Sequence, residues 1–141
     1  MYILIFFEHV YDPNKFLKEV HNILSDGGYQ CFSMPNMTQM LKSYQANAVN
    51  FEHPFYYDKE TVKKILLSNG FRIVRTKKFL NNHSIMYITK KINTFKTQKY
   101  SKFQKNKKIF SKLYASWVND KSKIESYLKD NKNILDRKSV V

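Results

Sequence analysis

The stretch EHVYDPNKFLKEVHNILSDGGYQCFSMPN, residues 8–36, decides the fold, because it combines an apolar-periodic helix, a tight turn and a strand. It directly follows the apolar run Tyr2–Phe7, which is typical of a strand buried on both faces of a sheet. Asp12 is the expected helix N-cap, and Pro13 fits the first helical position. The order strand, helix, strand predicts a β-α-β unit of an open α/β sheet.

The helix and the second strand of this unit are marked by spacing and by turn residues. Apolar residues recur at three- and four-residue spacing and form one stripe: Phe16, Leu17, Val20, Ile23 and Leu24. Asp26-Gly27-Gly28 ends the helix, because glycine readily adopts the left-handed conformation that closes a helix. Tyr29–Met34 is the next predicted strand, and Pro35-Asn36 stops it.

The segment that follows predicts a further helix and a strand pair. Residues Met37–Tyr44 favour a short helix, and Asn47–Tyr57 favours a loop rich in aromatic and polar groups. A clear helix is expected over Lys59–Ser68, capped by the preceding aspartate. The strand-like runs Phe71–Phe79 and Ile85–Lys90 are separated by only five residues, which indicates an antiparallel pair.

The net charge of +14 is concentrated near the C-terminus. Residues 1–90 contain 11 Lys+Arg and 7 Asp+Glu, a net charge of +4, whereas residues 91–141 contain 14 and 4, a net charge of +10. We therefore expect two parts, 1–91 as the folded α/β part and 92–141 as a Lys-rich tail of basic amphipathic helices. The tail's aromatic residues follow helical spacing, and a second helical piece is expected over Lys121–Asn131.

The tail allows two interpretations. The charge is nearly all lysine in a chain rich in Asn, Ile, Tyr and Phe, so a solvated lysine surface is the simpler one, and nucleic acid is an unlikely partner. The alternative is a binding module in which lysines and aromatic residues of Lys91–Lys112 contact nucleic acid or acidic surfaces. No helix-turn-helix or RNA-recognition motif supports this alternative.

The single cysteine, Cys31, excludes an internal disulfide and a cysteine-based metal cluster, and no metal site is predicted. Cys31 lies in an apolar strand, so a buried thiol is expected. The apolar run near the N-terminus is far shorter than the roughly 20 residues of a membrane helix, and it lacks the features of a signal peptide. We therefore expect a soluble, cytoplasmic protein without a membrane span.

Polar side chains follow the predicted strands at their carboxyl ends, where ligands bind in open α/β sheets. Glu8-His9 and Pro35-Asn36 stand at two such ends, and Glu52-His53 lies in the loop that follows. We expect these groups to converge over one edge of the sheet.

These residues carry a resemblance to a known family. The segment FFEHVYDPNKFLKEVHNILSDGGYQCFSMPN, residues 6–36, and the downstream NFEHPFYYDKETVKKILLSNGFRIV, residues 50–74, resemble the second half of class I S-adenosylmethionine-dependent methyltransferases. The resemblance covers about residues 2–91 and implies the C-terminal part of a doubly wound, Rossmann-like sheet. Within the superfamily the chain is most similar to sugar C-methyltransferases, although Asn50 stands where that branch has a tyrosine.

The resemblance implies a small-molecule substrate and a set of site residues. His9 and His53 would be the acid–base groups, and Glu52 would orient an imidazole. A neutral imidazole suits this role, because it titrates near neutral pH. Substrate contacts are expected from Glu8, Tyr11, Asn36 and Tyr56, each of which also has a purely structural interpretation.

The resemblance also implies what this stretch of sequence does not supply. In the family, a glycine-rich turn after the first strand grips the cofactor, S-adenosylmethionine. Here the three glycines, Gly27, Gly28 and Gly70, are all expected to end helices. The chain is therefore expected to be a fragment that is inactive alone, has no identifiable cofactor-binding residues, and pairs with a chain that supplies the missing strands.

Overall fold

The computed structural model describes residues 2–4, 7–50, 52–97 and 103–130 of the chain. It divides into two compact units, Met1–Ser101 and Lys102–Val141, and each is described here by itself. The division falls ten residues after the change in composition at residue 91.

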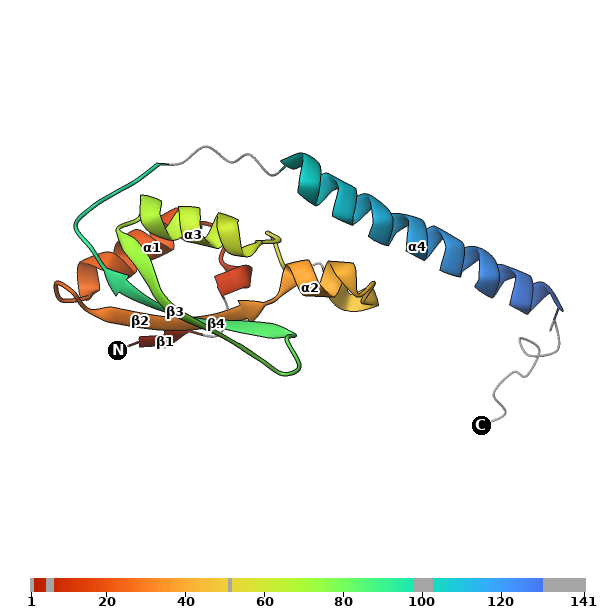
Figure 1. The fold of residues 1–141 in the computed structure, drawn as a ribbon, viewed down its shortest axis with the longest axis horizontal. Helices are drawn as coiled ribbons and strands as arrows, with labels where there is room; N and C mark the ends of the chain where they lie inside the picture. The colour runs from red at the N-terminus through yellow and green to blue at the C-terminus, as the bar shows by residue number, and fades with distance from the viewer. Residues whose placement is uncertain (1, 5–6, 51, 98–102, 131–141) are drawn as a thin grey trace. The chain divides into compact units, whose positions relative to one another are not determined.

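The first unit alternates strands and helices (Figure 1). Its elements are β1 (Tyr2–Leu4), a 3-10 helix η1 (Phe7–His9), α1 (Pro13–Ile23), β2 (Tyr29–Pro35), α2 (Met37–Lys42), a second 3-10 helix η2 (Ala46–Ala48), α3 (Lys59–Ser68), β3 (Phe71–Phe79) and β4 (Ser84–Lys91). These elements confirm the predicted α/β class.

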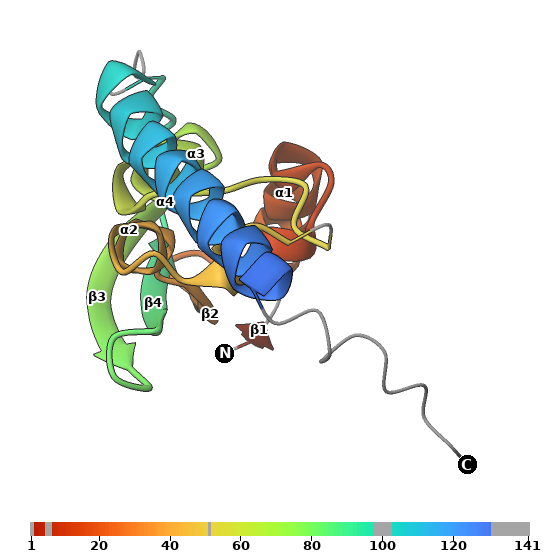
Figure 2. The same ribbon diagram turned by 90° about the vertical axis from the view of Figure 1, so that its right-hand side faces the viewer.

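Four strands form one mixed sheet in the order β1-β2-β4-β3. β1 pairs with β2 in parallel, whereas β4 is antiparallel to both β2 and β3. The predicted antiparallel pair is therefore confirmed, and its second strand lies inside the sheet. Helices α1 and α3 lie on one face of the sheet (Figures 1 and 2). No described helix of the first unit covers the opposite face.

Helix α1 forms as the sequence predicts. The Asp12 side chain accepts a hydrogen bond of 2.9 Å from the backbone N–H of Lys15, and Pro13 occupies the first helical position. The apolar stripe directs Leu17, which is fully buried, toward the sheet. Helix α3 starts in the same way, because the Asp58 carboxylate accepts the backbone N–H of Thr61.

Aromatic side chains dominate the core between the sheet and the two helices. Phe7 lies at its centre, with ring centroids 5.0 Å from Phe32, 5.8 Å from Tyr57 and 6.3 Å from Phe16. Phe32 stacks in turn on Tyr87, its cross-strand neighbour in the β2–β4 pair. The remaining buried members of this cluster are Leu17, Leu24, Met34, Val62, Leu66, Phe71 and Ile85.

Two predicted elements differ from the structure. The apolar run Tyr2–Phe7 was expected to be one strand, but β1 ends at Leu4 and Phe7 starts η1 instead. Residues 5 and 6 lie outside the described residues. Phe7 belongs to η1 because its ring fills the core under α1, and this tertiary contact outweighs the local preference for a strand.

The described part of the tail is helical as expected, but the expected division into two helical pieces is wrong. The described residues of the second unit, 103–130, form one continuous helix of 28 residues, α4 (Phe103–Asp130). It contains neither glycine nor proline, so nothing in its sequence ends the helix between the two expected pieces. Two ion pairs on its surface, Lys121–Glu125 and Lys123–Asp120, have helical spacing. Residues 131–141, including the end of the second expected piece, lie outside the described residues.

The expectation of a buried thiol is confirmed. Cys31 is a buried, free thiol on β2. Among the described residues, none of the helices combines the length and the apolar character needed to cross a membrane.

A glycine at the start of β3 provides a test of the packing between α1 and the sheet. Gly70 has φ +76°, and a Cβ built there would lie 2.6 Å from Nε2 of His21, whose ring donates a hydrogen bond to the carbonyl of Ile92. We expect Gly70→Ala to destabilise the fold more than Gly27→Ala. At Gly27 φ is similar, +70°, but a Cβ would meet only the flexible end of Lys90.

Urea denaturation measures the difference. Gly27→Ala should lower the free energy of unfolding by about 1–2 kcal/mol, the cost of the left-handed conformation. Gly70→Ala should lower it by roughly 1–3 kcal/mol more, because the new methyl group would clash with the His21 ring, which is held by its hydrogen bond to Ile92. Equal losses in the two variants would contradict the packing of His21 against Gly70.

Tyr57 predicts a pH dependence of stability. Burial raises the pKa of Tyr57 to about 12, and among the described residues its hydroxyl has no hydrogen-bond partner. Because the folded state keeps this proton while the unfolded chain releases it near pH 10, stability should fall between about pH 10 and pH 12, by up to roughly 2.7 kcal/mol for this residue. Tyr57→Phe should weaken that loss, as measured by urea denaturation from pH 7 to pH 12.

At pH 7 the same variant should keep or slightly raise stability, by up to about 1 kcal/mol, because it removes an unpaired buried hydroxyl. Tyr11→Phe, at a side chain that is 83% exposed, is the matched control and should not change the curve. A clear loss of stability in Tyr57→Phe at pH 7 would show that the hydroxyl has a partner.

Candidate functional site

The residues Glu8 and His9 are positioned by η1, which follows the carboxyl end of β1. The preceding residue, Phe7, is 1% exposed and fixes η1 to the core. Glu8 is largely buried, with a side chain that is 12% exposed, whereas that of His9 is 39% exposed. The core contact of Phe7 therefore holds a carboxylate and an imidazole at this edge of the first unit.

The third member of the site, His53, comes from the loop between η2 and α3. This loop is shaped by Asn50, whose side-chain oxygen accepts a hydrogen bond of 2.8 Å from the backbone N–H of Glu52. The hydroxyl of Tyr56 donates to the carbonyl of Asn50 at 2.6 Å and accepts from its backbone N–H at 3.0 Å. The backbone N–H of His53 donates to the same carbonyl at 3.3 Å. Asn50 and Tyr56 thus define the position of His53.

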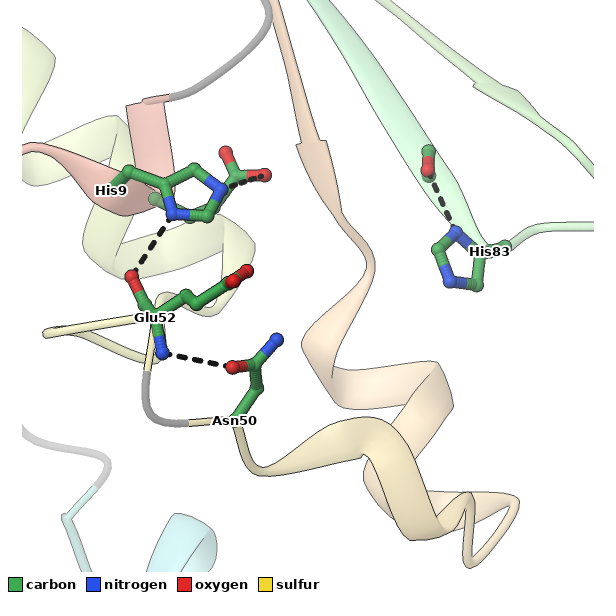
Figure 3. Close-up of polar contacts among 6 residues, drawn as sticks. His9, Asn50, Glu52 and His83 are labelled. Atoms are coloured by element: carbon green, nitrogen blue, oxygen red, sulfur yellow. Dashed lines mark hydrogen bonds and ion pairs between the residues drawn. The ribbon is translucent and has the colours of Figure 1, made fainter.

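One hydrogen bond connects the loop to η1. The Nδ1–H of His9 donates to the backbone carbonyl of Glu52 at 3.0 Å (Figure 3). Because Nδ1 carries the proton in this bond, the lone pair of the neutral ring lies on Nε2. The contact uses the main chain of Glu52, whose side chain is exposed. Its carbonyl group, not its carboxylate, therefore orients the imidazole.

Glu8, His9 and His53 form a compact cluster of ligand-type groups. One donor atom from each side chain lies within 4.8 Å of the other two. The rings of His9 and His53 meet edge to face with centroids 4.8 Å apart, and Oε1 of Glu8 lies 3.8 Å from Nε2 of His9. The structure thus brings together residues that are more than 40 positions apart in sequence.

Burial is the main influence on the charge of Glu8. Desolvation raises the pKa of this carboxyl group above its ordinary value, and its backbone hydrogen bond and the nearby His9 and His53 partly offset the effect. Its Oε2 is buried and has no hydrogen-bond partner among the described residues. The cluster therefore contains a carboxylate oxygen with unused bonding capacity, next to two imidazoles.

Two residues with predicted substrate contacts are not members of the cluster. Tyr11 is 83% exposed to solvent. Asn36 is buried, and its side-chain amide donates to the carbonyl of Asn82 at 3.0 Å, which fixes the turn between β3 and β4. His83 of the same turn contacts Ser84 and lies away from His9 (Figure 3). Binding roles for Tyr11 and Asn36 stay predictions.

Tyr56 lines a hollow of about 450 Å³ that is formed by residues of α1, of α3 and of the segment before α3. Its walls are Asn14, Phe55, Tyr56, Tyr57, Thr61, Lys64, Ile65 and Ser68. None of these is a member of the cluster, although the Tyr56 ring lies 6.3 Å from that of His53. We treat the cluster as the candidate site, because it contains three convergent groups that can exchange protons or bind a cation, whereas the hollow is open and mostly apolar.

Sequence reasoning missed two features of this site. Asn50 was noted only as a departure from the family, but it builds the loop that holds His53. An asparagine or aspartate side chain commonly opens a turn by accepting the backbone N–H two residues further along the chain, as Asn50 does. The capacity of Glu8, His9 and His53 to hold a metal ion was also missed, because no local spacing motif joins residues from two distant segments.

The loop anchor predicts a local effect of one hydroxyl group. Tyr56→Phe removes both hydrogen bonds to Asn50, so we expect faster amide hydrogen exchange at Asn50, Glu52 and His53. Global stability should fall by only about 1 kcal/mol or less, because these bonds are exposed to solvent. Exchange measured by mass spectrometry should be unchanged in Tyr11→Phe. Unchanged exchange of the loop in Tyr56→Phe would show that the loop does not depend on the hydroxyl.

Comparisons with known proteins identify the family. A solved structure titled as a putative hemolysin from Streptococcus thermophilus is similar over 86% of this chain, with 12% identity and a TM-score of 0.40. This chain covers 45% of that protein, and a likeness this weak supports no statement about fold or function. No curated protein sequence matches the chain. The sequence pattern of a methyltransferase domain family matches residues 4–76, which is more than half of the chain, so the chain belongs to the methyltransferase domain family.

Proposed function

We propose that this chain is the C-terminal part of an S-adenosylmethionine-dependent methyltransferase domain, and that it carries the side of the domain that contacts the methyl acceptor. The observation that carries the proposal is the cluster of Glu8, His9 and His53 at one edge of a chain that belongs to the methyltransferase domain family. The acceptor is a small molecule, and a sugar is the narrowest class that the sequence resemblance supports.

The sheet supports a partial, doubly wound arrangement. β1 and β2 are parallel and are joined by α1, which is the unit that such sheets repeat. Sheets of this class carry helices on both faces, whereas the described helices of the first unit lie on one face only (Figure 1). Within the described residues β1 pairs on one side only, with β2. Further strands beside β1 would complete the sheet.

The described residues do not fit the role of a cofactor cradle. Methyltransferases of this family generally use S-adenosylmethionine, whose binding requires a backbone turn without side chains. Gly27 and Gly70 both lie in turns after helices, with positive φ. A Cβ at Gly28 would lie 2.8 Å from the carbonyl oxygen of Ser25, so the space beside this glycine is already filled. We therefore assign cofactor binding to residues outside this chain and no methyl transfer to the chain alone.

The cluster is suited to act on the acceptor. Methylation of a hydroxyl or of an acidic carbon requires loss of a proton from the acceptor. His9 holds a lone pair on Nε2, because its Nδ1–H is committed to the carbonyl of Glu52. His53 lies beside it, and Glu8 can stabilise a positive charge on either ring. In this proposal His9 and His53 are the residues that contact the acceptor.

Two measurements test the proposal. Calorimetric titration of the chain alone with S-adenosylmethionine should show no binding tighter than about 1 mM. The coding sequence upstream of Met1 should encode, within about 100 codons, a strand followed by a glycine-rich turn, either in frame or one shift away. Tight cofactor binding by the chain alone would overturn the fragment assignment.

If the upstream sequence encodes the missing strands, the longer protein that contains them allows a kinetic test of the cluster. His53→Ala should lower kcat by about 10²–10⁴-fold, the range expected for a general acid or base. His83→Ala is the matched control and should change kcat by less than about twofold, because the side-chain hydrogen bond described for His83 is with Ser84 and its backbone hydrogen bonds do not need the ring. Similar losses in both variants would remove His53 from the acceptor site.

A further inference from the structure

We propose that Glu8, His9 and His53 form a binding site for a divalent transition-metal ion, and that Zn²⁺ fits their donor set best. Two imidazole nitrogens and one carboxylate oxygen are available, and all three donor atoms lie within 4.8 Å of one another. Sites with three such ligands are typical of zinc enzymes, in which a fourth position stays open. Imidazole donors favour zinc and its neighbours over magnesium and calcium.

The hydrogen bond of His9 is the second observation that points to a metal. A histidine that ligates a metal through one ring nitrogen almost always donates its other N–H to a carbonyl or carboxylate. His9 does this, because its Nδ1–H donates to the carbonyl of Glu52. The bond fixes both the tautomer and the direction of Nε2, which faces Oε1 of Glu8 at 3.8 Å (Figure 3). The ring is therefore already oriented as a metal ligand.

Glu8 supplies the third observation. Its Oε2 is buried without a hydrogen-bond partner among the described residues. A buried carboxylate oxygen in this state is costly, and a bound cation removes the cost. A neutral His9 cannot donate to this oxygen, because its one N–H is committed to the carbonyl of Glu52. A cation held between the three side chains would offset the charge of the carboxylate, and it would satisfy Oε2 directly where both oxygens of Glu8 coordinate it.

The geometry requires only a small contraction. Zinc bonds of about 2.0–2.1 Å place tetrahedral ligand atoms roughly 3.3 Å apart. Nε2 of His9 and Oε1 of Glu8 are 3.8 Å apart, so this edge is nearly formed. The longest edge of the cluster, at most 4.8 Å, must shorten by roughly 1.5 Å. Rotation of the His53 side chain, which comes from a loop and is only partly buried, can provide this movement.

The open position gives the metal a role toward the acceptor. It would take an oxygen of the acceptor, either a hydroxyl, whose pKa it would lower, or a carbonyl, whose neighbouring C–H it would make more acidic. This role rests on the proposed function, whereas metal binding itself does not. A metal-bound imidazole has no lone pair left for a proton. Occupation of the site would therefore transfer the activation of the acceptor from the two imidazoles to the metal.

The test measures Zn²⁺ binding to the full, untagged chain after treatment with a chelator. Competition with a chromophoric chelator gives the affinity and the stoichiometry, and Co²⁺ serves as a spectroscopic probe of the coordination. We expect one Zn²⁺ per chain. The Co²⁺ complex should show the d–d absorption bands of a site with a low coordination number, and it should show no charge-transfer band. Glu8→Gln and His53→Ala should each weaken Zn²⁺ binding by more than about tenfold.

His83→Ala is the matched control, because it removes one of the four histidines without touching the cluster, and it should keep the affinity within about twofold. Circular dichroism checks that each variant folds, and Glu8→Gln tests the site even if His53→Ala is unfolded, because it keeps the shape of the side chain. Absence of a stoichiometric site, or an equal loss in His83→Ala, would overturn the proposal. Neither S-adenosylmethionine nor an acceptor is present in this assay, so its failure is distinct from failure of the proposed function.

Discussion

The burial of Phe7 is the contact on which both the core and the candidate site depend. Its ring touches β2 through Phe32, α1 through Phe16, and the segment before α3 through Tyr57. A residue with contacts to three elements cannot shift without a loss of packing in all of them. Because Glu8 and His9 follow Phe7 directly in η1, the packing of Phe7 in the core fixes their backbone and therefore the position of this side of the site.

The other half of the site has a different origin. His53 belongs to a loop without regular structure, and polar bonds rather than apolar packing give the loop its shape. Asn50 and Tyr56 close the loop on itself, and the Glu52 carbonyl connects it to His9. These bonds are exposed, so each contributes little to stability. The site thus joins one rigid side to one adjustable side, which suits a centre that has to close around a ligand.

Local signals explain how much the sequence could predict. Helices α1 and α3 were predicted because Asp12 and Asp58 cap them and their apolar residues repeat at helical spacing. The β3–β4 pair was predicted because its connection is short. The end of β1 was not, since the departure of Phe7 from the strand depends on a partner in α1. The expected second helical piece over Lys121–Asn131 was not separate, because no glycine or proline between the two expected pieces ends α4.

The site shows the same difference between features set by local sequence and features set by tertiary contacts. The rule that polar residues gather at the carboxyl ends of parallel strands predicted that Glu8-His9 and Glu52-His53 would converge, and the structure brings them together. It also placed Asn36 at this edge, but it could not foresee that the amide would be committed to the carbonyl of Asn82. Position along a strand is a local property, whereas the partner of a side chain depends on which turn packs against it.

The chemistry of the site depends on the lone pair on Nε2 of His9. The bond from Nδ1–H of His9 to Glu52 leaves Nε2 free, and this nitrogen can accept a proton or bind a metal, but not both at once. The buried oxygen of Glu8 that has no hydrogen-bond partner among the described residues favours a cation beside the carboxylate, because the single N–H of a neutral His9 is already committed to the carbonyl of Glu52. In a partly buried site a bound metal also attracts the developing negative charge on an acceptor oxygen more strongly than a neutral imidazole does. The arrangement of bonds around Glu8 and His9 therefore supports the proposal of a metal ion held between Glu8, His9 and His53.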